Sequence, residues 1–595
     1  MDAKIVGVHI AGSDSTSRGY GAVVTRQMLD EVVMRFKPLL PQVNCNVMIR
    51  AKVNYDTLPD NPVLDAEVVG TCDRKKPNYR TELCRSPLFL RIADVPPVKY
   101  PAILSPKYVD GKFVDPIVLN ITDYSRGSSE PIPQLFRGAE LAYLAMIKRN
   151  CSDPVHINEI SFEEAVAGDK YKVPNLVSIN RSTSTGFPDG EFFKDKKRSI
   201  FGTDEFEFTS AECKYLMENV DEMYKHLANG PIDVICSVFP KDELRPIEKV
   251  KTLKTRLIMS ASISSSILTR MVFATYIDWF LEPKNRLKNW SAVGIDMASE
   301  DDLLQYVNYH HCGSTNYRTF AGDFSGFDKR LSAWLMEFSW KVFEMYTRSY
   351  RSVSDMNRAR NLYYSNTHPK MQVNDSLIQW SNSNPSGWPL TTPLNTTANC
   401  IANMYAIPYI ILGPSASESE VSKFWHFCNE HGHVRFTGFG DDGVLTVIKG
   451  VHGGYDFDKV TYNSLAEAFD SIGLVYTDEQ KSLDFDESDR TIFDVTFLKR
   501  KVRRSEIGLV ACLDVNTIVQ NIQWKKRDDV TLEIWHDKLE NFLNELSIHP
   551  DDVWDYYYPR LVEAYNGSVS DLIFSFEPTK LERMHRWRTS SLLLQ

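Results

Sequence analysis

The stretch VRFTGFGDDGVLTVIK, from Val434 to Lys449, decides the fold of this chain. Two runs of strand-forming residues flank a tight turn over 440–443, a pattern that predicts a β-hairpin. The turn carries two adjacent carboxylates, Asp441 and Asp442, whose mutual repulsion costs energy unless a cation lies beside them. A divalent metal ion would relieve that repulsion. An isolated Gly-Asp-Asp is more often an ordinary acidic turn, so the interpretation depends on the rest of the sequence.

Length and composition describe a folded protein of several subdomains. The chain has 595 residues, too many for one core, and its 43 % hydrophobic and 25 % charged residues are usual for a soluble globular protein. Ten cysteines without a CxxC pair argue against a disulfide framework and a thiolate zinc module, and favour a reducing compartment. The sequence shows no signal peptide and no apolar run long enough to span a bilayer, so we expect no transmembrane segment.

The overall charge does not suggest a nucleic-acid binder, because the formal net charge is −10. Four local blocks of Lys and Arg differ from this average. They lie at 194–198, 241–256, 499–504 and 525–527. One such block alone is usually a solvated face. Four of them in an acidic protein favour a channel that tracks phosphates, with the acidic residues elsewhere.

A second acidic site lies upstream of the hairpin. The segment RTFAGDF, Arg318 to Phe324, predicts a short strand that ends near Asp323. Asp328 follows at the turn into a helix, where its alternative role is that of an N-cap. If the two strands are neighbours in one sheet, Asp323 meets the Gly-Asp-Asp carboxylates, as the binding of two Mg²⁺ ions requires. One face of the helix carries Leu331, Trp334, Leu335, Phe338, Val342 and Tyr346.

The segment KDELRPIEKVKTLKTRLI, Lys241 to Ile258, carries six basic residues without the apolar stripe of an amphipathic helix. We interpret it as an extended, proline-interrupted strand pair whose cations suit a triphosphate. Arg256 can fork onto phosphate oxygens, and Lys249 can act as a point charge. A salt-bridged surface hairpin is the alternative.

The segment SGWPLTTPLN, 386–395, predicts a glycine-hinged loop that becomes a helix with Thr392 as N-cap and Pro393 as first residue. The helix N-terminus and the hydroxyls of Ser386 and Thr391 suit a sugar or a phosphate. Further along, Pro408 should kink or end the helix.

Asn395, in the first turn of that helix, and Asp328 could both hydrogen-bond a ribose 2′-hydroxyl, the group that distinguishes RNA precursors from DNA precursors. Asn395 could equally be satisfied locally at the helix end.

Other segments give weaker signals. The turn at Thr183 to Pro188 offers donors for a nucleic-acid backbone, but a plain surface turn is equally compatible. The His- and Cys-containing stretch over 426–433 matches no familiar ligand spacing, so we expect no metal there. The segment over 361–383 is polar and broken. We expect a helix over 134–148 and another over 465–472, and a mainly helical region after Ser505.

Taken in order, STGFP, KDELRPIEKV…KTRLI, DFSGFD, SGWPLTTPLN, GDD, a glycine-then-lysine segment ending at Lys481, and FLKR resemble the motifs of viral RNA-dependent RNA polymerases of the picornavirus-like superfamily. They match that family's motifs G, F, A, B, C, D and E over roughly Thr183 to Arg500, with further similarity at 523–525. Seven collinear motifs make the resemblance strong, although each alone is weak.

The resemblance implies an α+β fold, a closed right hand of fingers, palm and thumb whose palm is an antiparallel sheet packed on helices. The implied division is an N-terminal extension with fingers over 1–274, palm over 275–360, a fingers insertion over 361–383, palm again over 384–504, and a helical thumb over 505–595.

The resemblance also implies roles for individual residues in RNA-directed RNA synthesis with Mg²⁺ or Mn²⁺. The metal ligands would be Asp323, Asp441 and Asp442, and Lys481 would be the general acid that protonates pyrophosphate. The residues that face the ribose or triphosphate of the incoming nucleotide would be Lys241, Arg245, Lys249, Arg256, Asp328, Ser386, Gly387, Thr391 and Asn395.

The implied partners are an RNA template and primer or product, NTPs, a nucleotidylated protein primer and other viral replication proteins. The 183–188 turn would guide the template and the FLKR segment, 497–500, would grip the primer. The implied location is the host cytoplasm, in replication complexes at membranes recruited by partners.

Two departures from the family pattern stand out. Phe439 replaces the usual Tyr before Gly-Asp-Asp, which removes a hydroxyl but keeps the ring, so we expect no loss of chemistry. The chain is also longer than the compact members, which suggests the insect, plant or marine picorna-like type. A reverse transcriptase and a catalytically silent RNA-binding scaffold are the alternative functions.

Overall fold

The fold is described from a computed structural model. The described residues are 8–13, 18–22, 66–71, 79–92, 96–121, 124, 129–153, 158–193, 197–348, 350–380, 383–485, 488–527, 532–567 and 578–590. Part of the first basic block, 194–196, lies outside them. Strands β1 (Val8–Ser13) and β2 (Arg18–Ala22) pair with each other.

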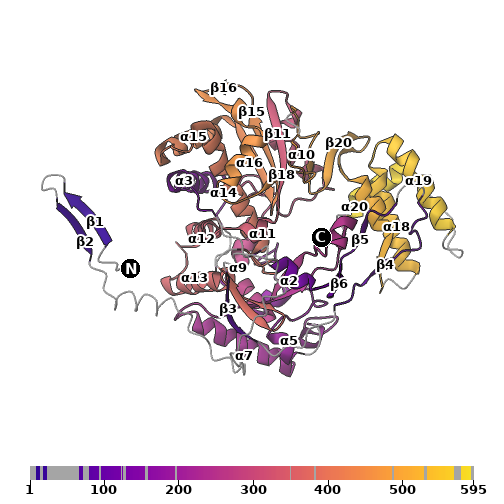
Figure 1. The fold of residues 1–595 in the computed structure, drawn as a ribbon, viewed down its shortest axis with the longest axis horizontal. Coiled ribbons are helices and arrows are strands. Elements are labelled where there is room, and N and C mark those ends of the chain that lie inside the picture. The colour runs from indigo at the N-terminus through magenta and orange to yellow at the C-terminus, as the bar shows by residue number, and fades with distance from the viewer. Residues whose placement is uncertain are drawn as a thin grey trace.

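A four-stranded antiparallel sheet in the order β14-β15-β11-β18 holds both acidic segments. Its strands are β14 (Val434–Phe439), β15 (Asp442–Ile448), β11 (Tyr317–Phe324) and β18 (Tyr476–Asp478). Figure 1 shows β15, β11 and β18 beside one another. The predicted hairpin and strand are confirmed, and the two are neighbours. The turn is shorter than predicted, because Phe439 pairs with Asp442 and only Gly440 and Asp441 lie between the strands.

One buried helix, α14 (Thr391–Leu412), supports this sheet. It packs against β14 and against α3 (Pro133–Asn150), α12 (Ala333–Thr347) and α16 (Tyr462–Asp470). Helices α3 and α16 confirm the two predicted helices within a few residues. A further helix, α15 (Glu418–His431), packs on α3.

The N-cap predicted for α14 is wrong, and one of the two effects predicted for Pro408 is absent. The helix begins at Thr391, with Leu390 rather than Thr392 at the N-cap, because the Thr391 hydroxyl closes the preceding loop by donating to the Pro385 carbonyl at 2.6 Å. Pro408 does not end the helix, which continues to Leu412. Burial of α14 along most of its length offsets the hydrogen bond that a proline removes.

The helix after Asp328 also differs from expectation. A short helix, α11 (Phe327–Arg330), precedes α12, so Leu331 lies in the break between them. This shifts the helical register, and Trp334 is 41 % exposed rather than on the buried face.

A second sheet has five strands in the order β10-β8-β12-β13-β3. They are β10 (Leu257–Ala261), β8 (Ile235–Pro240), β12 (Lys370–Val373), β13 (Ser376–Trp380) and β3 (Ala66–Thr71). The expectation that 361–383 is broken is therefore wrong: α13 (Val353–Thr367) runs into the β12–β13 hairpin. The polar residues misled the pattern because Gln372 is buried and accepts a hydrogen bond from the Ser237 hydroxyl at 3.0 Å.

The basic segment 241–258 is only partly extended. Strand β9 (Leu244–Pro246) leads into a one-turn helix, α8 (Ile247–Lys251), before β10. The sequence pattern missed α8 because none of its residues is buried, so it carries no apolar stripe.

The C-terminal region contains strands β19 (Thr496–Phe497), β20 (Arg500–Ser505), β21 (Gly508–Leu513) and β22 (Trp524–Lys526). Its helices are α17 (Val515–Ile522), α18 (Leu532–Ser547), α19 (Asp551–Asn566) and α20 (Lys580–Ser590). The region is mainly helical after Ser505, as expected.

The segment over 83–101 links the basic segment to the C-terminal region. Strand β5 (Lys99–Pro101) pairs with β9 of the basic segment, and β4 (Leu83–Arg85) pairs with β22 of the C-terminal region. Figure 1 shows β4 and β5 next to the C-terminal helices. Leu88 and Ile92 are buried in the core of those helices. The described chain therefore closes on itself.

A buried imidazole lies against the acidic hairpin. Both ring nitrogens of His310 are 2.8 Å from threonine hydroxyls, those of Thr437 on β14 and Thr446 on β15. Burial lowers the pKa of His310 to about 3. The imidazole is therefore neutral in the folded protein, where it joins the two strands of the hairpin.

We expect this histidine to make stability depend on pH. The unfolded imidazole titrates near 6.5, so its contribution is fully present above about pH 6.5 and is lost as the pH falls toward 3. The loss should reach about 2 kcal/mol near pH 5. Urea unfolding from about pH 8 to about pH 5 should show a steeper decline for the wild type than for His310→Gln. Parallel declines would contradict this account.

Candidate active site

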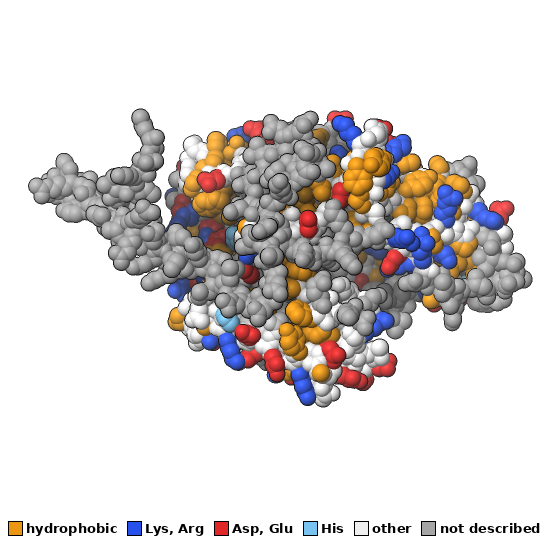
Figure 2. Space-filling model, turned by 60° about the horizontal axis from the view of Figure 1, so that its bottom comes forward, with side chains coloured by type: hydrophobic (Ala, Val, Ile, Leu, Met, Phe, Trp, Pro, Cys, Tyr) orange, Lys and Arg blue, Asp and Glu red, His pale blue; other side chains and the backbone are white. Residues whose placement is uncertain are grey.

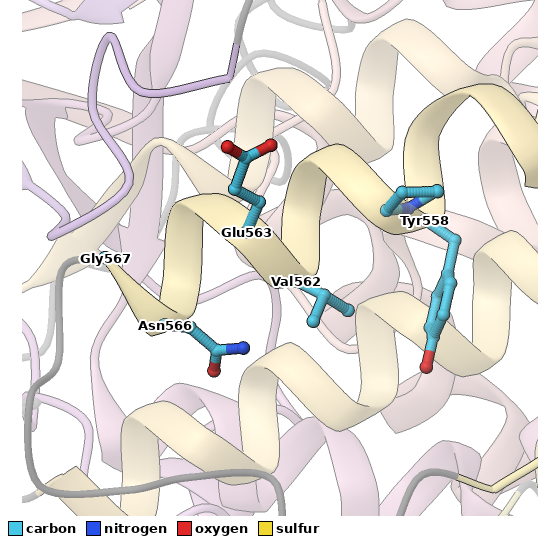
Figure 3. Close-up of a pocket in the computed structure, with 6 residues that line it drawn as sticks. Tyr558, Val562, Glu563, Asn566 and Gly567 are labelled. Carbon is cyan, nitrogen blue, oxygen red and sulfur yellow. The ribbon is translucent and has the colours of Figure 1, made fainter.

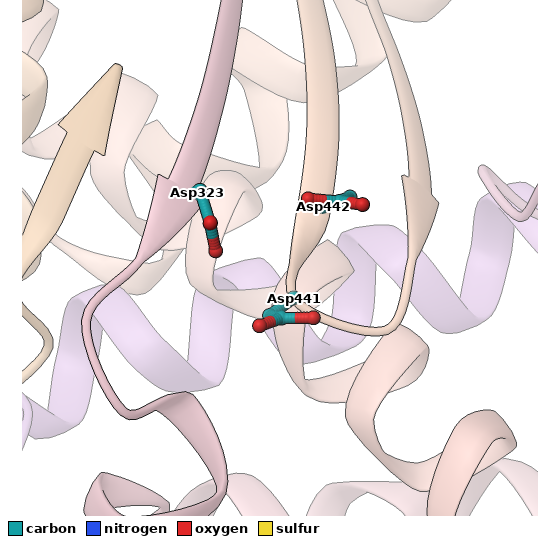
Figure 4. Close-up of side chains that lie close together, drawn as sticks. All are labelled: Asp323, Asp441 and Asp442. Atoms are coloured by element: carbon teal, nitrogen blue, oxygen red, sulfur yellow. The ribbon is translucent and has the colours of Figure 1, made fainter. Parts of the chain in front are cut away.

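Three carboxylates meet at the tips of adjacent strands. Asp323 lies near the end of β11, Asp441 in the hairpin turn and Asp442 at the start of β15 (Figure 4). One carboxylate oxygen from each lies within 4.8 Å of the others. The predicted convergence is confirmed, because β11 pairs directly with β15. This is the one group in the described residues with the spacing of metal ligands, and the stretch over 426–433 forms none there.

The cluster is electrostatically strained without a cation. Burial, with the charge of Asp323 added, raises the pKa of Asp442 to about 6. Burial and the charges of Asp323 and Asp442 also raise the pKa of Asp441. Lys481 places its ammonium group against Asp323 in an ion pair. Oxygen ligands of this kind fit Mg²⁺ or Mn²⁺, and a cation already lies beside one of them.

Two residues of α14 fix the hairpin turn, and sequence reasoning missed both. The Gly440 backbone N–H donates to the Thr396 hydroxyl at 2.9 Å. The Asn399 side-chain amide donates to the carbonyls of Gly440 and Asp441 at 3.0 and 3.1 Å. A signal was present in the sequence: asparagines recur every four residues at 395, 399 and 403 in a buried helix.

Asp328 and Asn395 lie together, as predicted. The Asn395 side-chain amide donates to the Asp328 carboxylate. Burial raises the pKa of Asp328, and this hydrogen bond opposes the rise. The alternative roles are both wrong: Gly326 is the N-cap of α11, and the side-chain partners of Asn395, Asp328 and Asn384, lie outside α14.

The 386–391 loop is bound to the protein itself. The Met259 backbone N–H donates to the Ser386 hydroxyl at 3.0 Å. Gly387 bridges Ser260, and a Cβ at Gly387 would collide with the Met259 carbonyl. Together with the Thr391 hydrogen bond to Pro385, these contacts hold the loop against β10.

One acid neutralises much of the basic segment. Arg256 Nε donates to Glu243 at 2.6 Å, and the side chains of Lys241 and Arg245 lie 3.5 and 3.6 Å from the same carboxylate. Although burial alone would raise it, the pKa of Glu243 is held below its usual value by Arg256 and the other cations. The salt-bridged alternative for this segment is thus partly correct.

The basic segment nevertheless faces the carboxylates. The pKa of Arg256 is raised first by its hydrogen bond to Glu243, and the charges of Asp441 and Asp323 add to the rise. The pKa of Lys249 is lowered by burial and by neighbouring cations that include Lys481. Positive charge therefore lies near enough to Asp441 and Asp323 to interact with them.

The remaining predicted contacts are in turns. Lys197 Nζ donates to the Thr183 hydroxyl at 2.8 Å, so the first basic block holds the 183–188 turn. Leu498 and Lys499 form the β19–β20 turn. The charge of Lys499 lowers the pKa of Asp442 and so offsets part of the rise that burial causes. On the face in Figure 2, described Lys and Arg side chains are interspersed with Asp and Glu.

A surface pocket lies elsewhere. It is lined by α19 residues that include Tyr558, Val562 and Glu563, together with Gly567 (Figure 3). It contains no predicted site residue.

Comparisons with known proteins agree with this geometry. A family model described as viral RNA-dependent RNA polymerase matches residues 93–565. The chain is 26 % identical to a replicase polyprotein of acute bee paralysis virus, over 96 % of this chain and 30 % of the relative. It is also 26 % identical to that of Drosophila C virus, over 93 % and 32 %. The chain thus spans about a third of these relatives.

A solved structure has the same fold. It is described as the Sicinivirus 3Dpol RNA-dependent RNA polymerase, with a TM-score of 0.67 at 20 % identity over 88 % of this chain and 99 % of that one. The expected α+β right-hand fold is confirmed. No described helix is both long and apolar enough to cross a membrane.

The raised carboxyl pKa values predict pH-dependent cation binding. Protons compete with the metal for Asp441 and Asp442, so Mn²⁺ should bind more tightly as the pH rises from about 6 to about 8. Calorimetric titration with Mn²⁺ measures this directly. Asp442→Asn should weaken binding and reduce its pH dependence, whereas Asp301→Asn, a change at an exposed carboxylate of α10 (Glu300–Tyr309), should do neither. Affinity that does not vary with pH would contradict the prediction.

Proposed function

The chain belongs to the viral RNA-dependent RNA polymerases, and we propose that it copies the genome of a positive-strand RNA virus by transferring nucleotides from NTPs to the 3′-hydroxyl of an RNA strand on an RNA template. The observation that carries this proposal is the meeting of Asp323, Asp441 and Asp442 at adjacent strand tips opposite a basic segment.

The three carboxylates would hold the metal ions. When bound, two divalent ions would activate the attacking 3′-hydroxyl and neutralise the triphosphate and the leaving pyrophosphate. The protein would contribute position and charge. Thr396 and Asn399 of α14 fix the hairpin turn by hydrogen bonds to its backbone, and the β11–β15 pairing sets the separation of the acids.

The triphosphate would lie against Lys241, Arg245, Lys249 and Arg256. Three of these cations share Glu243, so an entering triphosphate competes with that carboxylate for them. Lys481 would donate a proton to pyrophosphate as it leaves. Its ion pair with Asp323 supports this role, because the ammonium group already reaches the metal-binding acids.

The ribose would be read by Asp328 and Asn395. Their hydrogen bond joins two polar side chains that could both bond to a 2′-hydroxyl, which supports a preference for ribonucleotides over the reverse transcriptase alternative. The loop residues Ser386, Gly387 and Thr391 would shape this site by holding the loop against β10.

The division into fingers, palm and thumb at the boundaries given above is also proposed. The β12–β13 hairpin from 361–383 lies in one sheet with the strands that flank the basic segment, which supports assigning both to the fingers. The Thr183 turn would guide the template and the 497–500 turn the primer strand.

A nucleotidylated protein primer and other viral replication proteins are the proposed partners, in membrane-associated complexes of the host cytoplasm. The two insect-virus relatives are polyproteins, which supports work beside other viral proteins.

Primer extension on an RNA template with Mg²⁺ or Mn²⁺ tests the activity. The wild type should extend the primer, and Asp441→Asn should lower the rate at least about a hundredfold, because one of the charges that would hold the ions is lost. Asp301→Asn serves as the matched control and should extend normally. Absence of wild-type product, or full activity of Asp441→Asn, would refute the proposal and favour a silent scaffold.

Lys481→Met should slow nucleotide transfer by about a hundredfold or more through loss of the general acid, with little change in NTP binding. Rapid-quench measurement of single-nucleotide incorporation separates the two quantities. Lys423→Met, at an exposed lysine of α15, is the control. A variant that transfers at the wild-type rate would remove Lys481 from the mechanism.

A further inference from the structure

We infer that Asn384 is a positioning residue that fixes the side-chain amide of Asn395 and thereby sets the preference for ribonucleotides over deoxyribonucleotides. The inference rests on the proposed function, and it adds a residue that neither the motifs nor the comparisons assign. It follows from a chain of hydrogen bonds that runs from a buried loop residue to the pair expected to read the ribose.

The hydrogen bonds run in one direction, from the donor Asn384 through Asn395 to the acceptor Asp328. Asn384 Nδ2 donates to Asn395 Oδ1 at 2.8 Å, and Asn395 Nδ2 donates to Asp328 Oδ1. A primary amide has an acceptor on one side and donors on the other. Because Asn384 engages the acceptor, the donor side of Asn395 must face Asp328. Without Asn384, rotation of the Asn395 amide would place an oxygen against the Asp328 carboxylate.

The backbone of Asn384 is anchored to the same turn. Its N–H donates to the Asp328 carbonyl at 2.9 Å, and the neighbouring Ser383 N–H donates to the Leu331 carbonyl at 3.0 Å. Asn384 thus contacts both members of the ribose pair, one through its main chain and one through its side chain. Movement of one member relative to the other would break one of these contacts.

Asn384 is fully buried, and within the described chain no group donates to its Oδ1. Burying half of an amide unsatisfied costs about 1–3 kcal/mol. Stability alone would favour an apolar side chain at this position. The side-chain hydrogen bond that the amide does make is the one to Asn395, so its benefit lies in orienting that residue.

Two substitutions separate orientation from packing. Asn384→Leu keeps the branched shape of the side chain and removes the donor. Asn384→Asp keeps the shape but replaces the donor with an acceptor, which should turn the Asn395 amide around. In primer extension, the ratio of kcat/KM for ATP to that for 2′-deoxyATP should fall about tenfold or more in both variants. The fall should come from ATP, with 2′-deoxyATP nearly unchanged. An unchanged ratio would overturn the inference.

A double-mutant cycle tests whether Asn384 acts through Asn395. In an Asn395→Ala background, Asn384→Leu should leave the ratio where Asn395→Ala alone puts it. A further fall of similar size in the double variant would show that Asn384 acts by another route and would refute the assignment.

Asn366→Leu is the matched control, a buried amide of α13 that donates to the Leu362 carbonyl and accepts from Ser265. It should lower thermal stability without changing the ratio.

Calorimetric binding of ATP and 2′-deoxyATP to the enzyme with its RNA primer and template gives a readout that needs no turnover. The wild type should prefer ATP and Asn384→Leu should lose that preference. If Asn384→Leu prefers ATP over 2′-deoxyATP as strongly as the wild type does, the inference is overturned, even if the enzyme polymerises. A wild type that makes no RNA but shows the expected binding difference would instead refute the proposed function alone.

Discussion

Repulsion among three closely spaced carboxylates is the constraint on which the structure depends. Asp323, Asp441 and Asp442 are brought within reach of one another by the pairing of β11 with β15. The pKa values of Asp441 and Asp442 are raised, which shows that their ionised forms are unfavourable in this position. Other parts of the protein must therefore support the hairpin. Helix α14 fixes the turn by side-chain hydrogen bonds, and Lys481 and the basic segment supply positive charge around it.

Two further groups of side chains lie around the proposed nucleotide site. The carboxylate of Glu243 contacts three cations, Lys241, Arg245 and Arg256, and so holds them together. Because one carboxylate serves three cations, none of them is fully neutralised. Asp328, Asn395 and Asn384 form a second group, in which Asn384 donates to Asn395 and Asn395 donates to Asp328. In each group one residue to which we assign no chemical role contacts the residues proposed to bind the nucleotide.

The sequence was sufficient for features that depend on local pattern. The hairpin over 434–449, the strand ending near Asp323 and helices α3 and α16 follow from local pattern, and the convergence of the acids was implied by the ordered motifs. Features without an apolar pattern were missed. Helix α8 has no buried residue, and the polar 361–383 segment forms strands in which the buried Gln372 is satisfied by Ser237. Asn384 and Asn399 act through partners that only the fold brings together.

The bridge made by the segment over 83–101 has a consequence for the order in which the molecule assembles. The Ser86 hydroxyl donates to the Ile522 carbonyl across 436 positions of the sequence, and β4 pairs with β22 beside it. Contacts so distant in sequence are costly to close and form late. Residues 83–86 must therefore wait until residues 522–526 have been synthesised, so this link closes only after β11 and β15, which lie between them in the sequence, have been made.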